Sequence, residues 1–220
     1  MTLAALDRET LGYGRAAVLP GLSFALAPGE RVVLLGRSGV GKTTLLNAMH
    51  DRLARDHRTA LVPQDQALVP QLSVLKNVLM GRLDDHGALY NLTNLLHVRR
   101  ADRAGVAGVL TPLGLAELAD RPVRALSGGQ KQRVALGRAW WRGGAVLIGD
   151  EPVSAVDETQ AEALLGQMRD RFPTALLALH DVALARSFAT RLVGLRRGGI
   201  LFDAPATEVS DGDIAALYAH

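Results

Sequence analysis

The stretch Gly36-Arg37-Ser38-Gly39-Val40-Gly41-Lys42-Thr43 decides how the rest of the sequence is interpreted. It fits the pattern G-x-x-x-x-G-K-[ST], in which glycines let the backbone turn tightly and direct its N–H groups at phosphate oxygens. The apolar run Arg31–Leu35 precedes it, and Thr43–Leu53 has helical character. This order predicts a nucleotide site, with the Lys42 ammonium on the terminal phosphates and the Thr43 hydroxyl on Mg²⁺.

Two adjacent carboxylates, Asp150 and Glu151, follow a second apolar run, Ala145–Ile148. The C-terminal end of a buried strand is where an open α/β sheet binds its ligands. We expect Asp150 to hold Mg²⁺, directly or through water, and Glu151 to orient or deprotonate the attacking water. Combined with the glycine loop, this acidic pair favours a nucleotide-hydrolysing site over a structural strand end.

Strands alternate with helices along the chain, which is typical of a parallel α/β sheet. The expected strands are Leu22–Ala27, Arg31–Leu35, Ala60–Val62, Ala145–Ile148, Ala175–Leu179, and a hairpin of Arg191–Leu195 with Ile200–Phe202. The expected helices are Thr43–Leu53, Ser73–Arg82, Val106–Leu110, the stretch after Ser127, Ala161–Arg171 and Val182–Ala189. The mostly helical region from Gln71 to Arg138 is interpreted as an insertion in the sheet.

Composition narrows the possible functions. The chain has 220 residues and a net charge of +3, and 48% of its residues are hydrophobic. It has no cysteine, which excludes disulfides, thiolate zinc sites and a cysteine nucleophile. No secretion signal and no apolar run of roughly 18 residues is found. Aromatic residues make up 4% and do not interleave with a basic stripe, so no nucleic-acid partner is expected.

The segment Leu126-Ser127-Gly128-Gly129-Gln130, followed by Lys131–Ala139, is the most specific part of the sequence. Ser127 is expected to cap a helix, and Gly128 and Gly129 leave backbone N–H groups open for an anion. The segment resembles the signature motif of ABC-transporter ATPases. The order of glycine loop, glutamine, LSGGQ, Asp-Glu and histidine is similar to that family along nearly the whole chain.

The resemblance implies a P-loop NTPase fold in which the helix tip at Ser127 closes on the γ-phosphate held by a second subunit. Two ATP molecules would then be sandwiched in a head-to-tail homodimer. By resemblance, ATP contacts Tyr13, Gly36, Arg37, Ser38, Gly39, Val40, Gly41, Lys42, Thr43, Thr44, Ser127, Gly128, Gly129, Gln130 and Asp157. Mg²⁺ is assigned to Thr43, Gln64 and Asp150, and catalysis to Glu151, His180 and Gln64.

Several of these roles come from the resemblance alone. Tyr13 resembles the aromatic residue that stacks on adenine, although a core or turn tyrosine is the alternative. Gln64 resembles the glutamine that senses Mg²⁺ and water and links to the transmembrane partner, with Gln66 as a less favoured neighbour. Ser154–Asp157 resembles the loop that crosses the dimer interface in that family, with Asp157 as its acid. His180 resembles the histidine that contacts the γ-phosphate, and its neutral form can donate that hydrogen bond.

The chain is expected to form a single ABC ATPase domain over residues 1–220. Its RecA-like core is predicted at about 1–65 and 144–220, and its helical subdomain at about 66–143. Lys42 and Gln64 are only 22 positions apart, where the family has about twice as many, so the antiparallel β subdomain should be shortened. Gly149 stands where the family has another apolar or small residue, and we interpret it as slack in the packing. No C-terminal regulatory domain is expected beyond His220.

Segments less constrained by ATP chemistry indicate the type of transporter. Leu68–Leu83, Gly194–Arg196, Phe202–Pro205 and Ile214–Tyr218 are similar to the corresponding parts of phosphonate-import ATPases. This resemblance implies a permease partner, indirect contact with a periplasmic solute-binding protein, and a place on the cytoplasmic face of the inner membrane. Arg99, Arg100 and Arg103 lie in the helical insert, either on its partner-facing side or on a solvated face.

Four alternatives remain. Another small importer, or an exporter of the lipoprotein or macrolide type, would share the ATP-binding residues. A soluble ABC ATPase acting on ribosomes or DNA usually has two cassettes or a long coiled-coil insert, which this chain lacks. A P-loop small-molecule kinase would explain neither Ser127–Gln130 nor His180.

Overall fold

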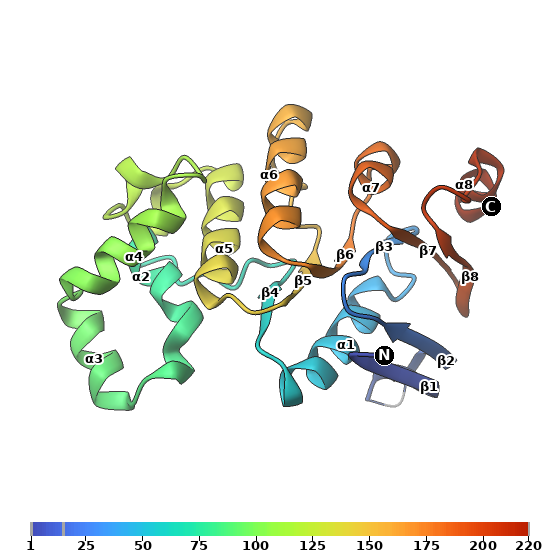
Figure 1. Cartoon of the computed structure of the whole chain (residues 1–220), viewed down its shortest axis with the longest axis horizontal. Helices are drawn as coiled ribbons and strands as arrows, with labels where there is room; N and C mark the ends of the chain where they lie inside the picture. The colour runs from blue at the N-terminus through green and yellow to red at the C-terminus, as the bar shows by residue number, and fades with distance from the viewer. Residues whose placement is uncertain (1, 15, 220) are drawn as a thin grey trace. The chain divides into compact units, whose positions relative to one another are not determined.

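The apolar runs form the central strands of a six-stranded sheet in the computed structural model, which describes residues 2–14 and 16–219 (Figure 1). The strand order is β4-β5-β6-β3-β7-β8, with parallel pairing of β5 to β6, β6 to β3 and β3 to β7, and antiparallel pairing of β7 to β8. The central strands are buried almost throughout, as expected where both faces are covered. The strands are β3 (Arg31–Leu35), β4 (Thr59–Val62), β5 (Val146–Asp150), β6 (Thr174–Ala178), β7 (Arg191–Arg196) and β8 (Gly199–Pro205).

The chain divides into two compact units. The first, which we call the core unit, comprises Met1–Leu61 and Gly144–His220, and the second, the helical unit, is Val62–Gly143. No helix in residues 2–14 and 16–219 is long and apolar enough to span a bilayer.

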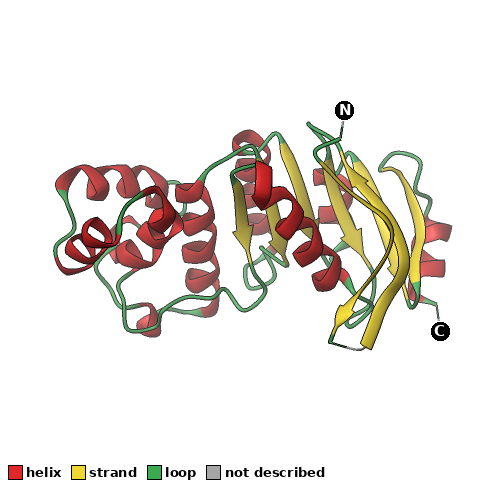
Figure 2. Ribbon diagram, turned by 90° about the horizontal axis from the view of Figure 1, so that it is seen from below, coloured by secondary structure: helices red, strands yellow, loops and turns green. Residues whose placement is uncertain are grey.

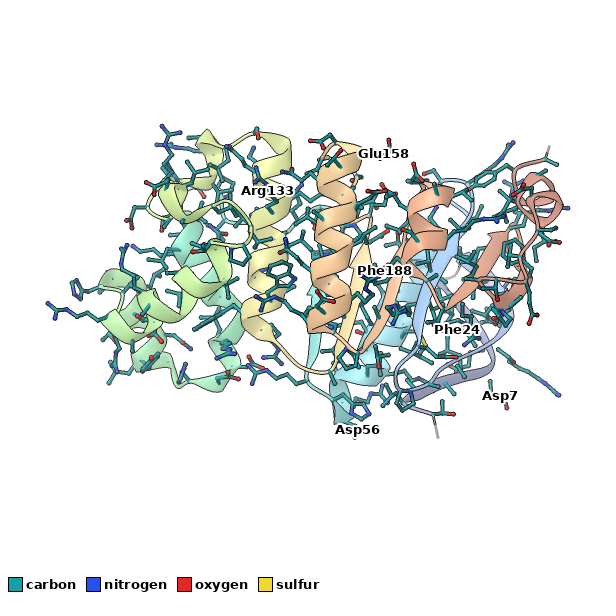
Figure 3. All side chains as sticks on the ribbon, turned by 45° about the horizontal axis from the view of Figure 1, so that its top comes forward. Asp7, Phe24, Asp56, Arg133, Glu158 and Phe188 are labelled. Carbon is teal, nitrogen blue, oxygen red and sulfur yellow. The ribbon has the colours of Figure 1, made fainter. Side chains whose placement is uncertain are left out.

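Both faces of the core unit's sheet are covered. One face carries helix α1 (Lys42–Asp56) and an antiparallel pair, β1 (Ala4–Tyr13) and β2 (Ala16–Leu26) (Figures 1 and 2). The other carries α6 (Glu158–Arg171) and α7 (Val182–Phe188). Phe24 of β2 and Phe188 of α7 are both 3% exposed and belong to these two opposite layers (Figure 3).

Helix α1 makes up most of the segment between Lys42 and Gln64, where the β subdomain was expected to be shortened. Leu45, Met49 and Leu53 recur every four residues and are fully buried, so one face of the helix packs on the sheet. The helix runs to Asp56, and β4 starts three residues later. The antiparallel part of the fold is the pair β1 and β2 before the glycine loop, so the β subdomain is short, as predicted. Strand β1 was not predicted, and β2 begins six residues before Leu22.

The helical unit is built around α5. Helices α2 and α4 pack against it, and Gly137 permits the close approach because a Cβ there would lie 3.2 Å from side-chain atoms of Leu113 and Val78. Ser73 caps α2 by accepting a hydrogen bond from the Lys76 amide at 3.3 Å. The α-helices are α2 (Val74–Leu79), α3 (Ala88–Leu96), α4 (Arg100–Leu110) and α5 (Gly128–Arg142), with 3₁₀ turns at Met80–Asp85, Ala116–Leu118 and Val123–Ala125.

The predicted hairpin near the C-terminus is present as β7 and β8. It is followed by a helix that was not predicted, α8 (Asp211–Tyr218), which packs against β7. Ser210 and Asp213 form a capping box at its start, with the Asp213 carboxylate accepting the Ser210 amide at 2.9 Å.

Candidate functional site

The glycine loop joins β3 to α1 in the core unit. Gly36, Gly39 and Gly41 have φ values of 144°, 78° and 110°, a region that favours glycine. A Cβ on Gly36 would come within 2.3 Å of the Leu195 carbonyl oxygen, so this position has no room for a side chain. The 15-residue helix α1 begins directly after Gly41, and its first N–H groups have no side-chain cap. Uncapped N–H groups at the positive end of a helix bind anions such as phosphate.

Lys42 lies at the first turn of α1 with only 5% of its surface exposed. Its ammonium donates to the carbonyl oxygens of Gly36 at 2.7 Å and Arg37 at 3.1 Å. Burial lowers the pKa of Lys42, while the negative charges of Glu151 and Asp150 oppose that shift. The loop thus holds one buried cation beside two carboxylates.

Asp150, the last residue of β5, meets Thr43 from the glycine loop. The Thr43 hydroxyl donates to Asp150 Oδ2 at 2.5 Å, and Asp150 is 6% exposed. Burial is the largest cause of the raised pKa of Asp150, and the hydrogen bond from Thr43 works against it. These two oxygen groups fit a divalent cation that takes its other ligands from phosphate and water, as Mg²⁺ does. No group of three or more acidic or histidine side chains among the described residues forms a complete metal cage.

Glu151 contacts His180 just beyond the carboxyl ends of β5 and β6. Its Oε1 lies 2.5 Å from His180 Nε2, and its amide donates to the Ala178 carbonyl oxygen at 3.1 Å. The backbone of Glu151 has φ 53°, which is uncommon for a residue with a side chain and is often found at functional sites. The pair lines a cavity of about 380 Å³ that also contains Ser154 and Asp181.

The interpretation of Gly149 as packing slack is wrong, because the space around it is filled. A Cβ at Gly149 would lie 2.8 Å from Leu177 Cδ2 and 3.2 Å from Pro152 Cγ. Gly149 therefore lets β5 and the turn after Asp150 pack closely, directly beside the carboxylate pair.

A Gly149→Ala variant should lose about 1 kcal/mol of unfolding free energy, because Leu177 and Pro152 must shift in a packed core. Chemical denaturation measures this directly. The matched control is Gly166→Ala in α6, where an added Cβ meets nothing within 4 Å and should stabilise the helix slightly. A Gly149→Ala protein as stable as the native chain would show that this packing is loose.

Asp157 caps α6, with its Oδ1 accepting the Gln160 amide at 2.9 Å. Just before it, the Ser154 hydroxyl donates to the carbonyl oxygen of Glu151 at 3.1 Å, so the loop is tied to the acidic pair.

Thr44 is buried in the first turn of α1. Tyr13 is the last residue of β1, and its side chain lies outside the described part of the structure.

The helical unit carries the remaining predicted residues. Ser127 Oγ accepts the Gln130 amide at 3.3 Å, and Gln130 Oε1 accepts the Ser127 amide at 2.9 Å, forming a capping box. Gly128 and Gly129 make the first turn of the 15-residue helix α5. This helix tip is a second segment of backbone suited to an anion.

Gln64 follows β4 in a tight turn that the helical unit itself holds in place. Gln66 and Ala67 have φ values of 62° and 43°, and the Arg138 guanidinium donates to both of their carbonyl oxygens, at 2.6 and 2.5 Å. Burial lowers the pKa of Arg138. No local pattern marks Arg138 beyond its place after the LSGGQ segment, because its partners are about 70 positions away.

The chain is similar to known proteins over most of its length. The family model described as ABC transporter matches residues 19–154. The phosphite import ATP-binding protein PxtA of Stutzerimonas stutzeri is 37% identical, over 97% of this chain and 86% of that protein. The phosphonates import ATP-binding protein PhnC 1 of Natronomonas pharaonis is 40% identical, over 95% and 96%.

Solved structures support the same fold. A dimeric bacterial ABC transporter cassette superposes with a TM-score of 0.77 at 24% identity, covering 92% of this chain and 98% of that one. A nucleotide-free ATP-binding cassette gives 0.75 at 20% identity, covering 99% and 95%. The chain therefore belongs to the ABC transporter family, as an ATP-binding and ATP-hydrolysing subunit.

Proposed function

We propose that this chain powers import of a phosphonate or a related phosphorus oxyanion, such as phosphite, through a membrane permease. The observation that carries ATP hydrolysis is the placement of Lys42, Thr43, Asp150, Glu151 and His180 around one glycine loop in the core unit. The cargo is supported by the relatives' names, over nearly the full length of the chain. Other small importers, and exporters of the lipoprotein or macrolide type, are the alternative for the cargo.

The phosphates of ATP would lie on the backbone N–H groups of the loop and on the first turn of α1. Lys42 would exchange its contacts with the Gly36 and Arg37 carbonyls for phosphate oxygens. Thr43 and Asp150 would hold Mg²⁺, with Gln64 completing the set. The ion would neutralise charge on the β- and γ-phosphates. Tyr13 would stack on adenine.

Hydrolysis needs a positioned water more than covalent chemistry by the protein. As the water oxygen forms its bond to the γ-phosphorus, the bond to the ADP oxygen breaks, and Glu151 accepts the water proton. His180 Nε2 orients the Glu151 carboxylate in this structure, at 2.5 Å, and would contact the γ-phosphate when ATP is bound.

A second copy would complete the site. The helix tip formed by Ser127, Gly128, Gly129 and Gln130 would close on the γ-phosphate held by the partner's loop, while Asp157 crosses the interface. In this arrangement the core unit would be the RecA-like core, and the helical unit would be the helical subdomain. We place the assembly on the cytoplasmic face of the inner membrane, with a periplasmic binding protein delivering the solute to the permease.

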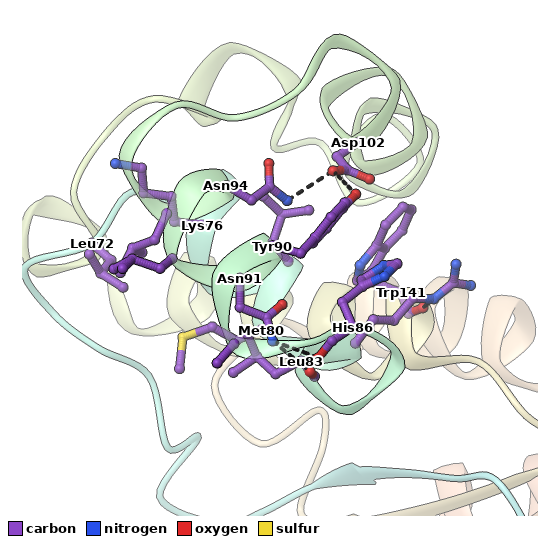
Figure 4. Close-up of a pocket in the computed structure, with 15 residues that line it drawn as sticks. Leu72, Lys76, Met80, Leu83, His86, Tyr90, Asn91, Asn94, Asp102 and Trp141 are labelled. Carbon is purple, nitrogen blue, oxygen red and sulfur yellow. Dashed lines mark hydrogen bonds between the residues drawn. The ribbon is translucent and has the colours of Figure 1, made fainter.

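The helical unit offers a surface for the permease. A cavity of about 410 Å³ lies between α2, the Met80–Asp85 turn and α3, with mainly apolar walls (Figure 4). Tyr90 and Asn94 of α3 both donate to Asp102 Oδ2 of α4, at 2.7 and 2.8 Å, which fixes α3 beside it. Beyond the cavity, Leu89 and Leu96 are 76% and 77% exposed.

An apolar cavity flanked by exposed leucines is typical of a surface that binds another protein. We infer that a cytoplasmic helix of the permease inserts an apolar side chain into this cavity. Lys76 at the cavity and Arg99, whose guanidinium lies 4.1 Å from the Tyr90 ring centroid, favour acidic residues on that helix.

A Leu92→Asp/Leu96→Asp variant should lose the permease, because two charges would face the apolar surface of the partner helix. Leu92 lines the cavity and is 56% exposed, so folding and ATPase activity should be kept. The measurement is co-purification with the co-expressed permease in detergent. Leu201→Asp is the control, since Leu201 is 43% exposed on β8 of the core unit. Equal recovery of both variants would remove the permease from this surface.

The transport proposal is tested in proteoliposomes that contain this chain, its permease and the cognate binding protein. Uptake of methylphosphonate or phosphite that depends on internal Mg·ATP is the expected result. ATP-dependent uptake of an unrelated solute, with neither of these transported, would overturn the cargo assignment and leave the ATPase assignment intact.

A further inference from the structure

The C-terminal end of α8 touches the first turn of the glycine loop. The Arg37 guanidinium donates to the main-chain oxygen of Tyr218 at 2.5 Å, across 181 positions of sequence. The Tyr218 hydroxyl is buried and lies beside the backbone of Gly36, without a hydrogen bond of good geometry. Burial raises the pKa of this hydroxyl, and the Gly36 N–H opposes the shift. Tyr218 thus contacts two consecutive loop residues through two different groups.

These two loop residues are the ones that hold the buried lysine. The carbonyl oxygens of Gly36 and Arg37 accept the Lys42 ammonium at 2.7 and 3.1 Å. On its other side, Gly36 packs against the Leu195 carbonyl oxygen of β7. A Cβ added at Gly36 would lie only 2.3 Å from that oxygen. The first turn of the loop is therefore enclosed by β7 and by Tyr218.

Helix α8 is anchored independently of this contact. Its capping box at Ser210 fixes the start, and Leu217, one residue before Tyr218, is 1% exposed. Arg186 of α7 also pairs with Asp211 at 2.8 Å. A helix fixed at its start and packed through Leu217 can transmit its position to the loop through its last residue.

We propose that Tyr218 is a positioning residue for the nucleotide, which braces the Gly36–Arg37 turn and so holds the phosphate loop in its ATP-binding shape. This role for Tyr218 rests on the proposed nucleotide site. It gives a function to the Ile214–Tyr218 segment, to which no contact with phosphate or Mg²⁺ is assigned. A preorganised loop binds without first being ordered. When the binding-competent shape is only partly populated, the apparent Kd rises in inverse proportion to its population.

The test compares Tyr218→Ala with Tyr218→Phe in the full chain. Tyr218→Ala removes the ring and the hydroxyl that lies beside Gly36, while the main-chain oxygen that accepts from Arg37 stays. It should raise the KM for ATP about five-fold, with kcat at saturating ATP unchanged. Tyr218→Phe keeps the ring and loses only a hydroxyl without a well-formed hydrogen bond, so it should restore the native KM. Arg186→Ala removes an exposed ion pair at the start of α8 and leaves the capping box and buried Leu217 in place, so it should leave KM unchanged.

Arg37→Ala gives a second route to the same answer if Tyr218→Ala folds poorly. Its side chain is exposed, and removing it breaks the contact with the Tyr218 oxygen. KM should rise, and because the two substitutions remove two contacts with the same turn, their effects on KM should be less than additive in the double variant. Fully additive effects would mean that Arg37 acts by contacting ATP directly, and would contradict a shared brace.

The outcomes separate the brace from the nucleotide site itself. If Tyr218→Ala lowers the Tm but keeps KM within two-fold of the native value, and Arg37→Ala does the same, Tyr218 is structural only and the proposal fails. If the native chain binds no ATP, the proposed function fails instead.

Discussion

A Glu151→Gln variant should bind Mg·ATP as tightly as the native chain and hydrolyse it at least about 100-fold more slowly. The amide keeps the size and one hydrogen-bonding oxygen of the carboxylate, but it cannot accept the proton of the attacking water. Because Glu151 is only 19% exposed and is held by His180, its backbone position should not change. Phosphate release under saturating ATP measures the loss, and equilibrium nucleotide binding measures what is kept.

The same variant should accumulate as a dimer in Mg·ATP, since hydrolysis is the step that would reopen it. Glu162→Gln is the matched control: it makes the same chemical change at an exposed position of α6 and should hydrolyse ATP normally. Turnover in Glu151→Gln close to the native rate would remove Glu151 from the role of base.

A Lys42→Ala variant should weaken ATP binding by about 10- to 100-fold. Hydrogen bonds from a charged donor contribute roughly 1.5–3 kcal/mol each, and each 1.4 kcal/mol is a factor of ten. Lys42 is the one lysine in the glycine loop, and its ammonium is already desolvated, so no solvent molecule replaces it well. Calorimetric titration with a non-hydrolysable ATP analogue gives the change in Kd.

Removal of a cation from another part of the same unit separates this effect from that of net charge. Arg169→Ala in α6, where the side chain is 52% exposed, should leave the Kd unchanged. If Lys42→Ala bound the ATP analogue as tightly as the native chain, the assignment of the loop as the phosphate site would be contradicted.

The parts of the fold that the sequence predicts well are those that a continuous apolar run or a helical period marks. Strands β3, β5 and β6 have nearly uniform apolar runs because helices or strands cover both of their faces. Strand β1 could not be found in this way. Its sequence AALDRETLGY mixes charges with apolar residues, since one side of the β1–β2 pair faces solvent and its pairing is interrupted by register shifts. Helix α8 is short and has no clear polar face, so its period is weak.

The residues of the site also differ in how well the sequence predicts them. Lys42, Thr43, Asp150 and Glu151 are local to strand ends and the glycine loop, so their proximity follows from a parallel sheet. The contacts of Arg138 with the turn after Gln64, and of Tyr218 with Arg37, join segments far apart in sequence. The close packing around Gly149 likewise depends on Leu177 of the next strand, which no local pattern reveals.

The central claim is that ATP is bound jointly by the glycine loop of one copy and the α5 tip of another. The chain has no cysteine, so thiols can be placed only where they are wanted. Ser38→Cys and Ser127→Cys are made separately in the Glu151→Gln background, and both positions are exposed. The two variants are mixed and treated with a short bifunctional thiol reagent, with and without Mg·ATP.

The account predicts a cross-linked dimer that forms in the mixture only with Mg·ATP, and that is absent when either variant is treated alone. A mixture that binds ATP fully and yet gives no cross-link between Cys at 38 and Cys at 127 would contradict it.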